Sequence, residues 1–228
     1  MEQPALDLLD SQGVEAATAY LESHPDPAAA AAGFSALARH AYIQRKDVAL
    51  MIQIYQAGIE YALRTSLDVA EQDAELAFSL SSAAKGLNYD LAANTWPGWA
   101  DDGIAITPEQ QALGYGAAHK NLELAEILEK GDLPLGRAHW LIGAHHLAAG
   151  EHAPALDAFA RAVDHTRRAG EPAEAQLSEG YHALAEGLLN GGTAGDRWDA
   201  ILGELAKAEN GGFFIQQLET ARRVFAGG

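Results

Sequence analysis

Cysteine is absent from all 228 residues of the chain. Without a thiol, the protein can form no disulfide framework, hold no metal through thiolates and use no cysteine nucleophile. The absence of cysteine thus excludes several chemistries of binding and catalysis together. The chain is still long enough to bury a sizeable core.

Basic residues are also scarce. Lysine and arginine number 15 against 32 aspartate and glutamate residues, which gives a formal net charge of −17 at pH 7. Such an acidic chain repels phosphate backbones and anionic lipid surfaces, so we expect neither nucleic acid nor a membrane as a partner. A neutral or basic partner fits the charge, although acidity that only maintains solubility explains it equally well.

Long apolar runs are missing too. No stretch approaches the ~20 apolar residues that a membrane-spanning helix needs. The first residues, MEQPALDLLDSQG, carry Glu2, Asp7 and Asp10 where a secretory signal has lysine or arginine before an apolar segment. These features predict a cytoplasmic protein.

Alternating runs of valine, isoleucine and threonine, which mark β-strands, are lacking, and helical spacing fills most of the chain. Asp26-Pro27 marks one helix start, with proline directly after a capping residue. Thr107-Pro108 marks another, and Gln110 completes a capping box there. We therefore predict an all-α fold. The expected helices span residues 4–10, 13–23, 27–45, 47–65, 68–93, 108–130, 134–149, 152–169, 173–190, 194–208 and 211–225.

Gly86 interrupts the helix expected over 68–93, but we expect the helix to continue through it. One apolar face runs on both sides of the glycine, formed by Leu76, Leu80, Ala83, Leu87 and Leu91. A glycine costs only ~1 kcal/mol relative to alanine in a helix interior, which is less than the packing of such a face contributes.

Two segments in the second half of the chain share one pattern. Residues 143–150 read GAHHLAAG and residues 180–187 read GYHALAEG, so Gly, His, Leu, Ala and Gly recur at the same spacing. A second helix with Ala155, Phe159 and Ala162 follows the first copy. Small residues at these places allow two antiparallel helices to approach closely, and the aromatic ring fills the gap between neighbouring hairpins.

On these residues the chain resembles the tetratricopeptide repeat (TPR) family, whose helical hairpins of about 34 residues stack into a superhelix. The best match runs from His139 to Arg168, with Gly143 at the small position of the first helix. The match departs from the family pattern at His139, Ile142 and His146, and it lacks the closing proline. The resemblance implies a TPR-like right-handed α-solenoid of antiparallel helix hairpins.

The resemblance also organises the chain as a single α-helical repeat domain over residues 1–228. We expect irregular N-terminal hairpins in 1–93, an aromatic loop in 94–107 and TPR-like hairpins in 108–228. The helices on either side of the loop form one long hairpin, so the loop is an insertion within it.

The loop NTWPGWADDGIAIT, residues 94–107, is longer than most connections between packed helices, and such loops are generally functional or disordered. Two tryptophans argue against disorder, because they would leave a large apolar surface exposed. Pro97-Gly98 suits the middle of a tight turn, which would bring Trp96 and Trp99 together against the helices.

Two roles for the loop stay open. In the structural role, the tryptophans fill a gap between hairpins, each ring burying up to ~250 Å². In the recognition role, the tryptophans line a concave surface and anchor a bound peptide, while Asp101 and Asp102 pair with its basic groups. By the resemblance, that surface includes Arg137 and Trp140.

Motifs of catalysis and metal binding are missing. The chain has no glycine-rich phosphate loop, nucleophile elbow or HExxH motif, and the adjacent Asp101 and Asp102 are poorly placed to act as an acid and base pair. The histidine-rich stretch 139–152 lacks the ligand spacing of a zinc site, since His145 and His146 point about a hundred degrees apart on a helix. We therefore predict a protein that is not an enzyme and has neither a metal nor a cofactor.

Together these features predict a non-catalytic scaffold that presents a concave helical groove to a protein or peptide. The expected binding residues are Trp96, Trp99, Asp101, Asp102, Arg137 and Trp140. The alternative is a module that senses a small molecule or peptide in an enclosed pocket of tryptophans and histidines. The apolar segment 211–225 either mediates a homodimer or covers the last hairpin.

Overall fold

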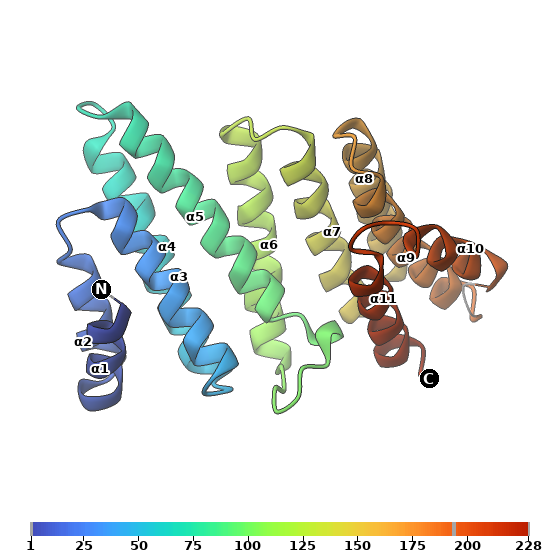
Figure 1. Cartoon of the computed structure of the whole chain (residues 1–228), viewed down its shortest axis with the longest axis horizontal. Coiled ribbons are helices and arrows are strands. Elements are labelled where there is room, and N and C mark those ends of the chain that lie inside the picture. Colours follow the sequence, from blue (N-terminus) through green and yellow to red (C-terminus); the bar gives the residue numbers. More distant parts are fainter. Residues whose placement is uncertain (1, 193–194, 228) are drawn as a thin grey trace. The chain divides into compact units, whose positions relative to one another are not determined.

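The computed structural model describes residues 2–192 and 195–227, which contain helices and turns and no strand (Figure 1). The prediction of an all-α fold is confirmed. The elements are α1 (Glu2–Gln12), α2 (Val14–Glu22), α3 (Pro27–Ile43), α4 (Val48–Val69), α5 (Ala74–Asn94), the 3₁₀ turn η1 (Pro97–Trp99), α6 (Pro108–Ile127), α7 (Asp132–Ala148), α8 (His152–Arg168), α9 (Pro172–Leu189), α10 (Gly195–Leu205) and α11 (Gly211–Ala226). In this part of the chain no helix combines the length and hydropathy that crossing a bilayer requires.

The chain divides into two compact units. The first comprises Met1–Thr95 and Gly103–Leu128, and the second comprises Trp96–Asp102 and Glu129–Gly228. The first unit therefore holds α1 to α6, and the second holds η1 and α7 to α11. The expectation of one repeat domain over residues 1–228 stays a prediction.

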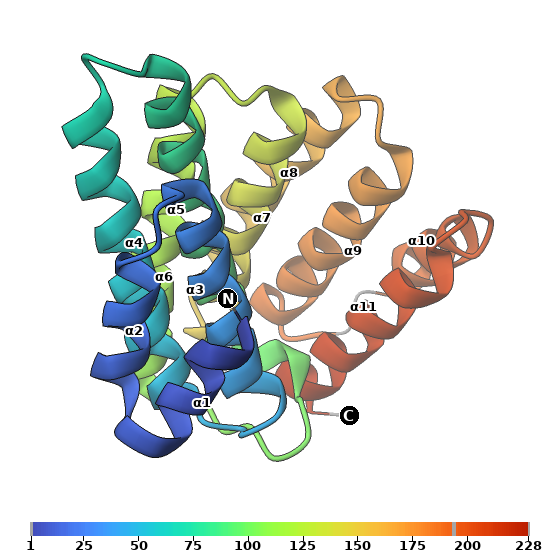
Figure 2. The ribbon, with the colours of Figure 1, turned by 60° about the vertical axis from the view of Figure 1, so that its left-hand side comes forward.

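Successive helices pack against each other in the first unit. Helix α3 packs on α4, α4 on α5 and α5 on α6, and α3 also contacts α5 (Figure 2). Phe34, Tyr55 and Leu80 are almost fully buried between these helices. Gly58 of α4 faces Phe34, where an added Cβ would lie 2.7 Å from the Phe34 Cβ. The absence of a side chain at Gly58 allows α3 and α4 to approach this closely.

The predicted helix starts in the first unit are confirmed. The Asp26 carboxylate accepts hydrogen bonds from the backbone amides of Ala28 and Ala29 at 2.9 and 3.1 Å. At the start of α6, the Thr107 hydroxyl accepts from the Gln110 amide at 3.2 Å, while the Gln110 side chain accepts from the Thr107 amide at 2.9 Å. Side chains thus satisfy backbone donors that a helix start leaves without partners.

The boundary between α4 and α5 differs from the prediction. The sequence placed one helix over 47–65 and the next over 68–93, whereas α4 continues to Val69 and α5 begins at Ala74. The Asp73 carboxylate accepts from the Leu76 amide at 2.9 Å and so sets the start of α5. The buried Ser66 hydroxyl donates to the Ala77 carbonyl at 2.7 Å, which fixes the end of α4 against α5. Helix α5 continues through Gly86 to Asn94, as predicted.

In the second unit, α7 packs on α8, α8 on α9, and α9 on both α10 and α11. Gly143 of α7 faces Phe159 of α8, where an added Cβ would lie 2.7 Å from the ring. Gly180, the equivalent residue of the second copy, instead faces Leu218 of α11. Gly180 therefore packs against α11, while α9 also contacts α10, which lies within the helix expected over 194–208. Residue 194 lies outside the described residues, and α10 ends at Leu205.

Candidate functional site

Trp96 lies in the core of the second unit. It precedes η1, and its side chain is 1% exposed. Its indole Nε1–H donates a hydrogen bond to the Ala144 carbonyl of α7 at 2.8 Å. A buried indole with a satisfied N–H is held by packing and by this bond, so the structure favours the structural role for Trp96.

Other aromatic rings surround Trp96. The distance from its ring centroid is 4.8 Å to Trp99, 5.7 Å to Trp140, 5.9 Å to Tyr181 and 5.8 Å to Phe225. The first three pairs are edge-to-face, an arrangement that aromatic quadrupoles favour. The prediction that the turn brings Trp96 and Trp99 together is confirmed. We call Trp96, Trp99, Trp140, Tyr181 and Phe225 the aromatic cluster.

Gly98 makes the turn of η1 possible. A Cβ at this position would overlap the Trp96 ring, so the backbone can pass over the indole only where a side chain is absent. Ala100 then closes the turn in the left-handed region, with φ of 51°. Glycine and proline therefore fold the loop onto its own tryptophan.

The remaining predicted site residues have different surroundings. Trp99 is partly exposed, Trp140 is 7% exposed, and Asp101 and Asp102 are exposed. Arg137 is also exposed, and its Nε donates to the Glu174 carboxylate of α9 at 2.9 Å. The structure thus brings the three tryptophans together in a core, and Arg137 forms an ion pair within its own unit.

Trp140 differs from Trp96 in its hydrogen bonding. Its indole Nε1 is buried and has no hydrogen-bond partner among the residues that the structure describes. A buried N–H without a partner costs roughly 1–3 kcal/mol. Trp140 is therefore held by ring packing alone, against Tyr181 at 5.3 Å and Trp99 at 5.8 Å between centroids.

No group of three or more His, Cys, Asp or Glu side chains is arranged to hold a metal ion in the described ranges 2–192 and 195–227. His146 Nδ1 lies 2.6 Å from Glu151 Oε2, so these two side chains interact with each other. His139 stacks on His165, with ring centroids 5.3 Å apart. Burial, assisted by the charges of His165 and Arg161, lowers the pKa of His139 to about 4.

Asp132 joins the start of α7 to the end of α8. Its carboxylate accepts from His165 Nδ1–H at 2.7 Å and from Arg168 Nε at 3.0 Å. These two hydrogen bonds, that of Arg168 first, lower the pKa of the Asp132 carboxyl. A carboxylate at a helix start and cations at a helix end both complement the helix dipoles, so this cluster has a structural explanation.

A groove lies between α3 and α5 in the first unit, and the sequence did not predict it. It has a volume of about 400 Å³. Its walls are mostly alanine and glycine, with polar residues toward one end. The lining residues are Ala28, Ala31, Ala32, Ser35, Ala36, Arg39, Ala83, Gly86, Leu87 and Asp90. The available sequence signal was the three- and four-residue spacing of small residues from Ala28 to Ala36.

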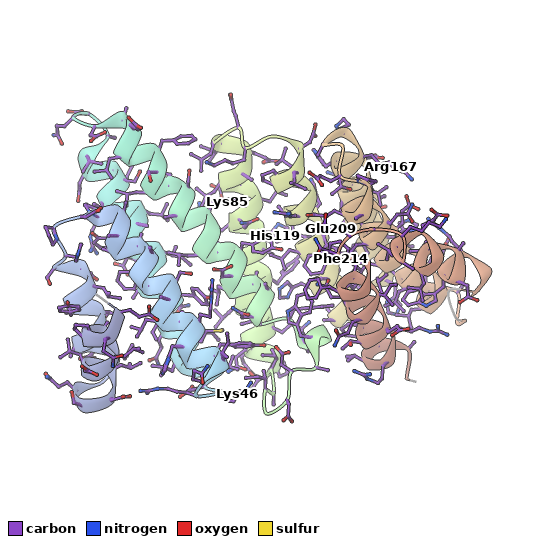
Figure 3. All side chains as sticks on the ribbon, viewed as in Figure 1. Lys46, Lys85, His119, Arg167, Glu209 and Phe214 are labelled. Carbon is purple, nitrogen blue, oxygen red and sulfur yellow. The ribbon has the colours of Figure 1, made fainter. Side chains whose placement is uncertain are left out.

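Asp90 forms the polar end of this groove together with Ser35 and Arg39. The Ser35 hydroxyl donates to Asp90 Oδ2 at 3.3 Å. Burial raises the pKa of the Asp90 carboxyl, although the Ser35 hydrogen bond and the charges of Arg39 and Lys85 oppose the shift. Lys85 stands on α5 one residue before Gly86 (Figure 3). No carboxylate oxygen of the described part of the chain lies within 4.0 Å of the Arg39 side-chain nitrogens.

Tyr55 of α4 interacts electrostatically with Asp90 and Arg39. Its hydroxyl accepts from Asn94 Nδ2 at 3.2 Å. Burial and the negative charge of Asp90 raise the pKa of Tyr55. The hydroxyl therefore stays protonated near Asp90.

A second, smaller groove of about 270 Å³ lies between α4, α5 and α6. Its lining residues are Gln56, Ile59, Glu60, Asn88, Leu91, Leu113, Gly116 and Ala117. Gly116 stands in open space, because an added Cβ would meet no heavy atom within 4 Å. Gly86 in the first groove has the same property. These two glycines are therefore a matched pair for filling one groove or the other.

Comparison with known proteins gives no family. No family model matches the chain, and no curated protein matches it with significant similarity. The resemblance to tetratricopeptide repeats rests on the residues of this chain.

Proposed function

We propose that the protein is a non-catalytic, TPR-like helical scaffold that binds a segment of a protein or peptide in the groove between α3 and α5. The observation that carries the proposal is the groove itself, which is about 400 Å³ in volume and lined by residues from two helices. Alanine and glycine walls leave room for the side chains of a ligand. A mostly apolar site with a few polar groups is typical of ligand recognition.

The packing of the helices supports the scaffold class. Helix α3 contacts both α4 and α5, as expected where hairpins stack in sequence. Glycines at helix contacts, Gly58 against Phe34 and Gly143 against Phe159, allow the close approach that the repeat pattern implies. A superhelix formed by such hairpins would present its first helices on one surface, where the groove lies between two of them.

The charge of the chain supports a neutral or basic partner. At a net charge of −17, a basic segment approaches with favourable long-range attraction, whereas nucleic acid and anionic membranes are repelled. The carboxylate of Asp90 gives the same preference at one end of the groove, although Arg39 in the same lining opposes it.

The alternative, a sensor with an enclosed pocket of tryptophans and histidines, has less support. The Trp96 ring is packed by four other aromatic rings and by Gly98, so the chain's own atoms occupy the space around it. His146 and His165 are engaged by Glu151 and Asp132. A ligand at this place would have to displace well-packed side chains.

Peptide selection with two groove-filling variants tests the proposed function. Random peptides displayed on phage are selected on the wild type, and selected sequences are synthesised and titrated against Gly86→Leu and Gly116→Leu. We expect Gly86→Leu to abolish binding and Gly116→Leu to leave it unchanged, because each leucine fills only its own groove. Both changes also improve helix propensity, so neither should unfold the chain. Selection of no peptide, or of peptides that bind Gly86→Leu equally well, would refute the proposal.

A further inference from the structure

The polar end of the groove between α3 and α5 contains a carboxylate with unused capacity to accept hydrogen bonds. Asp90 accepts from the Ser35 hydroxyl at 3.3 Å, which is long for a hydrogen bond between oxygens. An ionised carboxylate offers about four acceptor positions. No other hydrogen bond to Asp90 occurs among the described residues. A group that donates hydrogen bonds and carries positive charge would complete this site.

The rest of the groove is suited to an aliphatic chain. Seven of its ten lining residues are apolar: six are alanine or glycine, and the other is Leu87. Arg39 and Asp90 are the only charged residues of the lining. An apolar channel that ends at a carboxylate complements a side chain with a methylene stem and a cationic end.

We infer that the groove accepts a lysine side chain of the bound segment, with its stem along the alanines and its ammonium group at the Asp90 carboxylate. This inference rests on the proposed function, because it specifies what the bound segment must carry. Lysine suits the site better than arginine, since a compact ammonium with three donors fits between one carboxylate and one hydroxyl. An anionic ligand in this position would be repelled by the Asp90 carboxylate.

The other charged groups near Asp90 both oppose the binding of an ammonium group. Arg39 on α3 and Lys85 on α5 carry like charge to an ammonium, while Tyr55 on α4 is neutral. Arg39 is exposed, so solvent screens its repulsion, whereas the ammonium and Asp90 would meet at hydrogen-bond distance. Removal of the Arg39 charge should therefore strengthen binding of a lysine, and this sign distinguishes a cationic ligand from an anionic one.

Titration with short peptides, followed by the backbone amide signals of Ser35 and Gly86 in NMR spectra, tests the inference. The probe is acetyl-Ala-Ala-Lys-Ala-Ala-amide. One control replaces lysine by norleucine, which keeps the stem and removes the amine, and a second adds a free amino terminus to the norleucine peptide. We expect the lysine peptide to bind at least roughly tenfold more tightly than both controls. The first control has no ammonium group, and the ammonium group of the second is not at the end of the methylene stem. Equal binding of the norleucine peptide, or tighter binding through a free amino terminus, would overturn the lysine assignment.

Variants of the two charged residues give the decisive comparison. Asp90→Asn should weaken the lysine peptide roughly tenfold to a hundredfold, whereas Arg39→Gln should strengthen it by about two- to fivefold. Weakening by both changes would instead indicate a ligand that spans the two residues through an amide, and weakening by Arg39→Gln alone would indicate an anion. Either result overturns the inference. Thermal unfolding of Asp90→Asn checks that this variant is folded. Arg39→Gln changes an exposed residue, so its result does not depend on the stability of the Asp90 variant.

Failure of this inference is distinguishable from failure of the proposed function. Some phage-selected peptides could lose binding to Gly86→Leu but bind the wild type equally well with norleucine in place of lysine. This result would support the proposed scaffold function and refute the lysine assignment. If no selected peptide is sensitive to Gly86→Leu, both proposals are refuted.

Discussion

The indole Nε1–H of Trp96 donates to the main-chain carbonyl of Ala144 at 2.8 Å, a bond between residues 48 positions apart. Trp96 belongs to the loop that interrupts the helical pattern, and Ala144 lies inside α7 next to Gly143 of the repeat signature. This bond and the surrounding rings hold the loop on the helices of the second unit. The tryptophan that stands out most in the sequence therefore contributes to the core.

The first prediction compares the same substitution at two tryptophans. Trp96→Phe removes a satisfied N–H, whereas Trp140→Phe removes one that has no partner in the described part of the chain. We expect Trp96→Phe to lower the free energy of unfolding by about 1–3 kcal/mol more than Trp140→Phe does. Urea denaturation followed by far-ultraviolet circular dichroism measures both. Equal losses would show that the Trp96 bond contributes nothing beyond ring packing.

The second prediction contrasts two helix glycines. At Gly143 an added methyl would lie 2.7 Å from the Phe159 ring, whereas at Gly86 it would meet nothing within 4 Å. We expect Gly143→Ala to lower the free energy of unfolding by about 1–3 kcal/mol through overpacking. Gly86→Ala should raise it by up to ~1 kcal/mol through helix propensity. Thermal and urea unfolding provide the measurement, and a stabilising Gly143→Ala would contradict the close packing of α7 on α8.

The third prediction concerns pH. The pKa of His139 is lowered to about 4 in the folded protein, against ~6.5 in an unfolded chain. As the pH falls below ~6.5, the unfolded state binds a proton that the folded state resists, so stability is lost toward pH 4 by up to ~1.4 kcal/mol per unit. We expect His139→Gln to remove this contribution.

Urea denaturation of wild type and His139→Gln at pH 7.5 and pH 5 measures the difference. Titrating groups distant from His139 contribute equally to both proteins, so the comparison isolates His139 together with its stacked neighbour His165. Parallel stability changes in the two proteins would mean that His139 titrates normally in the folded state.

The fourth prediction separates the two sides of α11. Leu218 is fully buried against Gly180, whereas Phe213 is 62% exposed and its ring centroid lies 5.9 Å from that of Phe214. We expect Leu218→Ala to cost about 2–5 kcal/mol of stability. Phe213→Ser should change stability by less than ~0.5 kcal/mol. If residues 211–225 mediate a homodimer, which is one of their two predicted roles, Phe213→Ser should weaken self-association in sedimentation velocity experiments. An unchanged distribution of species would show that Phe213 does not contribute to such an interface.

The sequence by itself determined the helices, because the information for a helix is local. Asp26 and Thr107 cap helix starts through side chains two or three residues from the amides they bind, and this spacing is visible in the sequence. The boundary at residues 66–73 was misplaced, since no glycine or proline marks it and the Ser66 hydrogen bond to Ala77 depends on how two helices meet. The turn at Pro97-Gly98 was predictable for the same local reason as the caps.

Only the tertiary structure decided which side chains are buried and where space remains. Trp96 was compatible with a recognition surface or a core, and its burial depends on Ala144, Tyr181 and Phe225, which are distant in sequence. The groove depends on the separation of α3 and α5, and the stripe of alanines alone does not specify that distance. The contact of Gly180 with Leu218 likewise depends on the packing of α11 against α9, which the repeat pattern did not specify. Helix formation is governed by neighbours within one turn, whereas burial and cavities arise from contacts between residues that the chain itself does not place close together.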